Sequence, residues 1–150
     1  MNQKGITLVE LVVVFVIIAI GASLLVPNIG AWLPNYRLRS AARDVVSTMR
    51  TAQIKAVSNN IQYRVNLDDA EIGAPNCYIL QRHSGGAWVN DGALQTLPVG
   101  ITININHLPA GRALFNPNST STAGSVTLQN TKGMQRRITI TPATGRVRIE

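Results

Sequence analysis

The stretch GITLVEL at residues 5–11 begins a run of apolar residues that continues to Val26. A helix needs about 20 predominantly apolar residues to cross a bilayer, and residues 6–26 meet that length. The only charge in the run is Glu10. A carboxylate at membrane depth costs about 2.5–3.5 kcal/mol on insertion scales, so it requires a partner or a function. A short polar leader precedes the run, and its one basic residue, Lys4, is expected on the cytoplasmic side.

This arrangement resembles the class III leader peptides of type IV pilins and of type II secretion pseudopilins. In those families a membrane-bound prepilin peptidase cuts after the Gly that ends a short basic leader. The new first residue is usually methylated on its amine, and a Glu stands fifth in the mature chain. The resemblance implies cleavage between Gly5 and Ile6, N-methylation of Ile6 and a role for Glu10 in filament assembly. Phe or Met is usual in place of Ile6, and this departure affects the expected methylation more than the cleavage.

Glu10 and the new amine of Ile6 have a physical reason to interact. Residues four apart lie on the same face of a helix. When subunits stack in lipid, the carboxylate of Glu10 in one chain can pair with the amine of Ile6 in its neighbour and cancel a buried charge. The expected partners are other pilin-like subunits, the prepilin peptidase and the inner membrane.

Two other interpretations of the N-terminal segment stay open. An ordinary secretory signal has a basic start, an apolar core and a cut near small residues, which residues 21–23 could supply. An acidic residue inside the apolar core is unusual for such a signal. A plain membrane anchor accounts for the hydrophobicity of the run but not for Gly5 or Glu10.

Proline and aromatic residues mark the end of the apolar run. Pro27 and Pro34 predict a kink or local melting of the helix, because proline removes a helix hydrogen bond and clashes with the preceding turn. Trp32 and Tyr36 are typical of the outer membrane interface, where aromatic rings lie at the level of the lipid headgroups.

The residues from Tyr36 to about Asn59 have the periodicity of an amphipathic helix. Apolar side chains recur at alternating spacings of four and three residues and form one narrow stripe. The stripe consists of Leu38, Ala42, Val45, Met49, Ala52 and Ala56. Asn tolerates a left-handed backbone conformation, so residues 58–60 predict the end of the helix. We expect the stripe to pack on a sheet.

From Ile61 onward the apolar residues alternate with polar ones, which is typical of half-buried strands. The predicted strands are residues 61–67, 77–81, 113–115, 125–128, 137–141 and 146–149, and residues 97–103 are predicted as a turn that leads into a strand. Predicted turns lie at 68–73, 84–86 and 142–145, and residues 116–124 form a polar loop. The predicted fold class is α+β and pilin-like: a long N-terminal helix, transmembrane in its first half, is packed on a small antiparallel β-sheet domain.

The chain of 150 residues divides into four expected segments. They are a leader at 1–5, a transmembrane and filament-core half of the helix at 6–34, its amphipathic half at 35–59 and a β-rich domain at 60–150. About 115 residues remain outside the membrane element, which suffices for one soluble domain. The single cysteine, Cys77, cannot form an internal disulfide and is expected as a small apolar core residue.

The closing segment ITITPATGRVRI, residues 138–149, adds a second resemblance. Together with the long helix and the antiparallel strands, it resembles the GspH/FimT branch of pilin-like proteins, in which a Gly-Arg-x-Arg motif often closes the chain. Here that motif is GRVR at residues 145–148. The stretches LPVGI at residues 97–101 and FNP at residues 115–117 also look like that branch.

Basic residues gather near the C-terminal end of a chain whose net charge is +7. The cluster consists of Lys132, Arg136, Arg137, Arg146 and Arg148, against one acid, Glu150. Residues two apart on a strand point the same way, which places two guanidiniums about 7 Å apart and suits neighbouring phosphates of a nucleic acid. The resemblance to FimT-type minor pilins implies DNA binding for Arg146 and Arg148, and the charge pattern extends the hypothesis to the other three. The alternative is a solvated basic edge that discourages edge-to-edge strand pairing.

Other polar residues do not form a recognisable catalytic pattern. His83 and His107 are isolated from metal-ligand partners, and no nucleophile motif or phosphate-binding Gly loop is present. Asp68, Asp69 and Glu71 are expected as solvated acids of a turn, with a Ca²⁺ site as the alternative. We therefore expect no enzyme activity, no metal site and no cofactor.

The expected function is that of a minor pilin-like structural subunit of a type IV pilus, which assists filament assembly and binds DNA for uptake. The alternative is a minor pseudopilin of the GspH type in a type II protein secretion system, and a third possibility is a simple anchored binding protein. The expected location is the bacterial inner membrane, with a single pass, the soluble domain in the periplasm and incorporation in a pilus or pseudopilus.

Overall fold

The computed structural model describes residues 5–150, apart from the side chains of residues 24–31 and Ile105. Residues 1–4 of the predicted leader lie outside the described part. The chain divides into two compact units, Met1–Leu33 and Pro34–Glu150. One helix, α1 (Leu8–Asn59), continues from the first unit into the second, so the expected local melting at the prolines is not observed.

The first unit consists of the N-terminal part of α1. Its apolar side chains from Ile6 to Ile20 are exposed. Within the described part of the chain, no helix combines the length and the apolar character that crossing a bilayer requires. The membrane segment at residues 6–34 stays a prediction.

The second unit buries the apolar stripe of α1, as the sequence predicts. All six stripe residues are at most 2% exposed, and Ala41 and Val46 beside them are also buried. Asn60, with φ of 54°, follows the last helical residue in the left-handed region, which confirms the predicted helix end. Two hydrogen bonds connect α1 to the β-rich part of this unit. Asn130 Nδ2 donates to Asn35 Oδ1 at 2.9 Å, and Gln53 Nε2 donates to the carbonyl of Thr144, in the turn after β8, at 2.9 Å.

The strands form two antiparallel sheets rather than the single sheet expected. The first has the order β3-β2-β1-β6, with β4 also paired to β2. Its strands are β1 (Tyr63–Asn66), β2 (Cys77–Ser84), β3 (Ala87–Asn90), β4 (Gln95–Thr96) and β6 (Arg112–Phe115). The second has the order β5-β7-β8-β9 and comprises β5 (Ile101–Asn106), β7 (Gly124–Asn130), β8 (Gln135–Thr141) and β9 (Arg146–Ile149).

Two short elements lie between the strands, and the first replaces a predicted turn. The acidic segment forms a one-turn helix, α2 (Asp69–Ile72), and a 3₁₀ turn, η1 (Pro109–Gly111), precedes β6. Strands β3 and β4 were not predicted, because no residue of either is buried and they therefore lack the alternation that identifies a half-buried strand. The two-residue turn Gly85–Gly86, at φ of 59° and 83°, joins β2 to β3 in the left-handed conformation that glycine favours.

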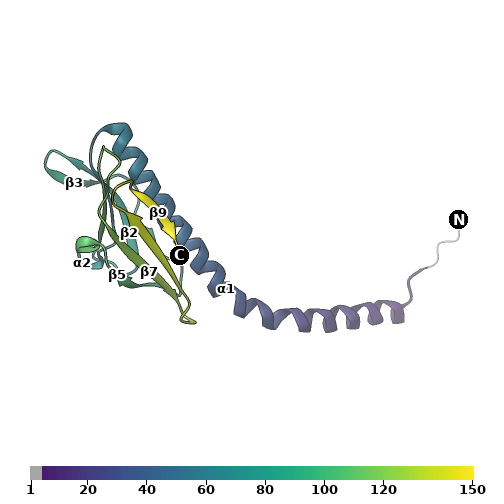
Figure 1. The fold of residues 1–150 in the computed structure, drawn as a ribbon. Coiled ribbons are helices and arrows are strands. Elements are labelled where there is room, and N and C mark those ends of the chain that lie inside the picture. Colours follow the sequence, from purple (N-terminus) through teal and green to yellow (C-terminus); the bar gives the residue numbers. More distant parts are fainter. Residues whose placement is uncertain (1–4) are drawn as a thin grey trace. The chain divides into compact units, whose positions relative to one another are not determined.

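One hydrophobic core joins α1 to both sheets. In Figure 1 the part of α1 in the second unit lies along the strands, with β9 beside it. Met49 of α1, Phe115 of β6 and Leu128 of β7 are each fully buried in this core. Tyr78 of β2 is also buried; burial raises the pKa of its hydroxyl, and a hydrogen bond with Thr48 of α1 partly opposes that rise. Cys77 is buried, as expected.

Replacement of the central stripe residue tests this arrangement. We expect Met49→Ala to lower the free energy of unfolding by about 2–5 kcal/mol, because it leaves a cavity where the side chain is fully buried. Ile54→Ala is the matched control on the same helix, since Ile54 is 68% exposed and should change stability by no more than about 0.5 kcal/mol. Denaturant unfolding of both variants measures the difference, and equal effects would contradict the assigned packing.

Candidate functional site

The residues of the predicted N-terminal motif lie at the start of α1. Thr7 precedes the first helical residue, and its Oγ1 accepts a hydrogen bond from the backbone N–H of Glu10 at 3.3 Å. The sequence Thr7-Leu8-Val9-Glu10 therefore has the form of a capping box, Thr-x-x-Glu, with Glu10 at the third helical position. A carboxylate there also interacts favourably with the helix dipole.

The residues on either side of the predicted cleavage point, Gly5 and Ile6, are exposed to solvent. Ile6 is 78% exposed, and a Cβ built on Gly5 would meet no atom within 4 Å. The space around Gly5 and its backbone therefore do not require a glycine in this chain. Processing between Gly5 and Ile6, and the role of Glu10 in assembly, stay predictions.

The predicted basic residues of β8 and β9 do not all lie on one face. Ile138, Ile140 and Val147 point into the core, each at most 3% exposed. Side chains alternate along a strand, so Arg137, Arg146 and Arg148 lie on the opposite, outer face. We call these three residues the outer arginines.

The register of β8 and β9 brings the outer arginines together. Arg146 pairs with Thr141 and Arg148 with Thr139. The backbone N–H of Glu150 donates to the carbonyl of Arg137 at 2.7 Å, which extends the ladder by one more pair. Arg137 is thus the diagonal neighbour of Arg148 on the adjacent strand, and residues in this relation lie about 7–8 Å apart.

Arg136 lies on the other face of β8, toward α1. With Ile149 of β9 it lines a cavity of about 300 Å³ whose other lining residues are Arg39 and Arg43 of α1. We call Arg39, Arg43 and Arg136 the inner arginines. The two on the helix were not predicted as site residues, although their spacing of four places them on one helix face. The sequence shows that spacing but not which strand packs beside it.

Lys132 lies in the turn between β7 and β8, apart from both groups of arginines in the strand ladder. Asn130 organises this turn, because its side-chain oxygen accepts hydrogen bonds from the backbone N–H groups of Lys132 and Met134 at 3.0 and 2.9 Å. The five basic residues predicted as one cluster therefore occupy an outer face, an inner face and a turn.

Gly145, the first residue of the closing motif, determines the position of the turn that precedes Arg146 and Arg148. Its φ is +62°, in the left-handed region, and an added Cβ would lie 2.7 Å from Gln53 Nε2 and 2.8 Å from the carbonyl oxygen of Ser119. Only glycine fits both the conformation and the space. The turn before β9 can therefore contact α1 closely, and this contact sets the position of the strand that carries Arg146 and Arg148.

The acids of the segment after β1 have structural partners. Asp68 Oδ1 accepts from the N–H of Ala70 at 3.1 Å and caps α2. Glu71 accepts from Arg64 Nη2 at 2.6 Å and from Asn66 Nδ2 at 2.6 Å, and it pairs with Arg112 at 2.8 Å. The expected solvated turn is therefore an ion-pair network.

Arg64 is the buried member of this network. Its side chain is 6% exposed, its guanidinium carbon lies 4.4 Å from the centre of the Trp88 ring, and its Nε donates to Gln81 at 2.7 Å. Burial lowers the pKa of Arg64, and the charge of Glu71 opposes that shift. Among the described residues, no group of three His, Cys, Asp or Glu side chains could hold a metal ion.

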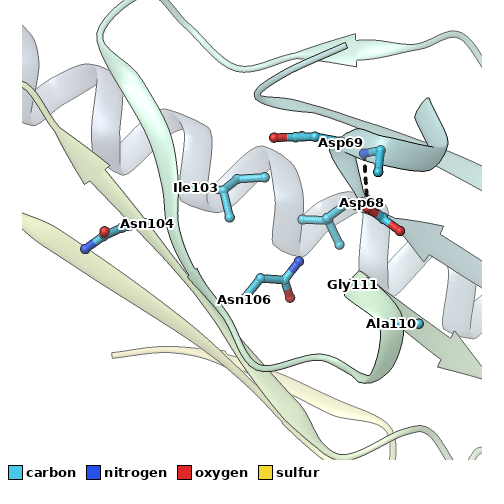
Figure 2. A pocket seen from close by; sticks show the side chains of 9 residues that line it. Asp68, Asp69, Ile103, Asn104, Asn106, Ala110 and Gly111 are labelled. Atoms are coloured by element: carbon cyan, nitrogen blue, oxygen red, sulfur yellow. Dashed lines mark hydrogen bonds between the residues drawn. The ribbon is translucent and has the colours of Figure 1, made fainter. Parts of the chain in front are cut away.

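A larger hollow lies between α2 and the segment that joins β5 to β6, with a volume of about 580 Å³. Figure 2 shows Asp68, Ile103 and Asn106 around it. Its described lining residues include no histidine, cysteine or serine.

The chain is similar to known proteins in its N-terminal motif and in its fold. Residues 1–26 match the family model of the prokaryotic N-terminal methylation motif. No curated protein matches the sequence significantly. The minor pseudopilin EpsH from the type 2 secretion system of Vibrio cholerae superposes with a TM-score of 0.63 at 14% identity, over 76% of this chain and 96% of that chain. The type IV minor pilin FimU of Pseudomonas aeruginosa gives 0.58 at 19% identity, over 77% and 90%.

These similarities confirm the predicted fold class. The long N-terminal helix on antiparallel strands is the fold of minor pseudopilins and minor pilins. The motif and the fold together support the resemblance to pilin-like proteins of the GspH branch. At these identities the solved structures show the fold alone, and both kinds of protein have it.

The ion-pair network gives a stability prediction. We expect Glu71→Ala to lower the free energy of unfolding by about 1–3 kcal/mol, because it leaves the buried donors of Arg64 and Asn66 without an acceptor. Asp69→Ala on the same helix is the control, since Asp69 is exposed. Denaturant unfolding compares the two variants. Millimolar calcium should not change the free energy of unfolding of either variant or of wild type. A calcium-dependent rise in stability that Glu71→Ala abolishes would restore the ion-site alternative.

Proposed function

We propose that this chain is a minor pilin-like structural subunit of a type IV filament system and not an enzyme. The observation that supports this most is the joint presence of a prokaryotic N-terminal methylation motif at residues 1–26 and the fold of minor pilins and minor pseudopilins. In this proposal residues 6–34 anchor the subunit in the bacterial inner membrane and form the filament core. Residues 35–150 lie in the periplasm.

Processing would convert the chain into an assembly-competent subunit. The prepilin peptidase cuts after Gly5, and the amine of Ile6 becomes the new, methylated N-terminus. Glu10 then lies four residues from a positive charge. An intramembrane carboxylate is costly unless it is paired, so Glu10 favours incorporation next to a neighbour that supplies an amine.

The capping box offers a competing explanation of Glu10, and two substitutions separate it from charge pairing. Glu10→Ala removes both the charge and the cap, whereas Glu10→Gln removes the charge but keeps a residue that suits the third position of a capping box. We expect both variants to insert in the membrane, since each makes the segment less charged, and both to enter filaments at least tenfold less than wild type. Immunodetection of sheared filaments measures incorporation.

Mass spectrometry of the membrane fraction is the control for that experiment, because it should find a mature chain that begins at Ile6 in wild type and in both variants. Normal incorporation of Glu10→Gln would assign Glu10 to helix capping instead of charge pairing. A wild-type chain that begins at Met1 or Leu24 would overturn the pilin-like proposal itself.

Within this class, we favour a minor pilin of a type IV pilus that binds DNA for uptake. The outer arginines support this choice: they lie on one exposed face of β8 and β9, where Arg148 is about 7 Å along the strand from Arg146 and about 7–8 Å diagonally across from Arg137 in backbone spacing. None of the ion pairs of the described residues engages them. Arginine binds phosphate oxygens in a bidentate manner, so this face suits a nucleic acid backbone.

The second candidate is a minor pseudopilin of the GspH type in a type II secretion system, which the likeness to EpsH supports. In such a subunit the outer arginines would form a solvated edge, since β9 is an edge strand and basic side chains discourage pairing with another sheet. Neighbouring secretion genes would favour this candidate, and neighbouring pilus-assembly or competence genes would favour the first.

A binding experiment distinguishes the two candidates. Residues from about Asn35 onward should bind double-stranded DNA weakly and without sequence preference, with a Kd of about 10⁻⁴–10⁻⁶ M that rises steeply with salt. Arg146→Gln with Arg148→Gln should weaken binding to every sequence and flatten the salt slope by up to about two units, because each phosphate contact contributes about 0.9. Fluorescence anisotropy at two salt concentrations measures both quantities.

Arg50→Gln with Arg82→Gln is the matched control, because it removes the same charge from two exposed positions away from β8 and β9. The control should keep the wild-type salt slope within about half a unit if binding is local to the outer face. Equal binding by wild type and the Arg146/Arg148 variant would remove the outer arginines as the DNA site. Absence of wild-type binding at low salt would favour the pseudopilin candidate.

A further inference from the structure

The inner arginines form a second concentration of positive charge, distinct from the outer face. Arg39 and Arg43 extend from α1 and Arg136 from β8, and Ile149 of β9 completes the lining of a cavity of about 300 Å³. A phosphate group with part of its substituents fits a space of this size. No residue of the GRVR motif takes part.

Among the residues that the structure describes, no acidic side chain forms an ion pair with the arginines of this cavity. The ion pairs among described residues engage Lys55, Arg64 and Arg112, and none engages an inner arginine. Arg37, the neighbouring basic residue of α1, donates instead to the carbonyl of Val99 at 3.2 Å. Like charges held around one cavity repel each other, and a bound anion relieves that repulsion.

We propose that Arg39, Arg43 and Arg136 bind the phosphate group of an anionic lipid headgroup. Guanidinium groups offer five N–H donors in a planar fork that matches phosphate oxygens, so three of them around one cavity can hold a single phosphate. The nearby Ile149, 39% exposed, offers an apolar contact for the glycerol or the start of an acyl chain.

The position of these residues in the chain favours a lipid over a free anion. Arg39 follows Leu33, the last residue of the first unit, by six residues, which reach at most about 20 Å even when fully extended. If residues 6–34 span the membrane, Arg39 and Arg43 cannot lie far from the headgroups. This step depends on the proposed membrane anchoring, whereas the phosphate chemistry of the cavity does not.

The test uses the full chain in micelles of a zwitterionic detergent and measures its thermal unfolding midpoint. The micelles contain added phosphatidylglycerol or, as the matched neutral-headgroup lipid, added phosphatidylcholine. Two further samples contain no lipid, one with inorganic phosphate and one with a short DNA duplex in solution. Phosphatidylglycerol should raise the midpoint of wild type by about 10 °C at a hundredfold excess over its Kd, because a ligand that binds only the native state stabilises it. Phosphatidylcholine should not.

Arg39→Gln with Arg136→Gln should abolish this rise, and its midpoint without anionic lipid should equal or exceed that of wild type, since repulsion has been removed. The same-charge variant Arg39→Lys with Arg136→Lys should keep part of the rise, because charge remains but the planar fork is lost. Arg50→Gln with Arg82→Gln is the control for net charge and should respond as wild type does. Alkaline extraction of membranes measures insertion of each variant separately, so failure of anchoring is distinguished from failure of lipid binding.

The result that supports the proposal is a rise with phosphatidylglycerol that depends on the inner arginines, with or without a smaller rise from inorganic phosphate. A rise with inorganic phosphate alone would overturn the lipid as the source of the phosphate. A rise only with a short DNA duplex, lost in the Arg39/Arg136 variant, would overturn the proposal and assign the cavity to a nucleic acid surface. No rise in wild type, or a rise that the Arg39/Arg136 variant retains, would also overturn it.

Discussion

Burial of one stripe of α1 is the interaction on which the second unit depends. The stripe contains large side chains such as Leu38 and Met49 but also Ala42, Ala52 and Ala56, and the small residues let strands approach the helix backbone closely. Both sheets contribute to the same core as the helix, so neither sheet would be covered without it. The strands are short and each sheet has an edge, and sheets of that kind need a partner face to be stable.

The same packing decides where the charges lie. Around the first sheet, Glu71 and Asp68 neutralise Arg64 and Arg112. On the second sheet, the described arginines have no ion-pair partner on either face of β8 and β9, so the charge excess of the chain is concentrated there. The helix contributes to this concentration, because its side chains Arg39 and Arg43 border the inner face. The printed ion pairs thus gather around the first sheet, whereas the surfaces proposed to bind phosphate lie on or beside the second.

Gly145 connects the packing of the helix to the presentation of charge. The turn before β9 contacts Gln53 of α1 and Ser119 of the preceding loop, and no side chain would fit at this position. A glycine followed by alternating arginines thus combines a close contact on the inner side with two guanidiniums on the outer side. This gives the closing motif a structural requirement that is independent of any ligand.

The sequence alone determined the features that depend on local spacing. The N-terminal motif, the helix stripe, the helix end at Asn60 and most strands could be predicted, because each is a pattern of residue types within a few turns or a single strand. The tertiary structure decided what depends on distant pairing. It divided the strands into two sheets, buried Arg64 against Trp88 and Glu71, and placed Arg136 beside Arg39 and Arg43 instead of beside Arg137. The reason is that alternation along a strand shows which residues share a face, but only the register with distant strands and the helix shows what that face meets.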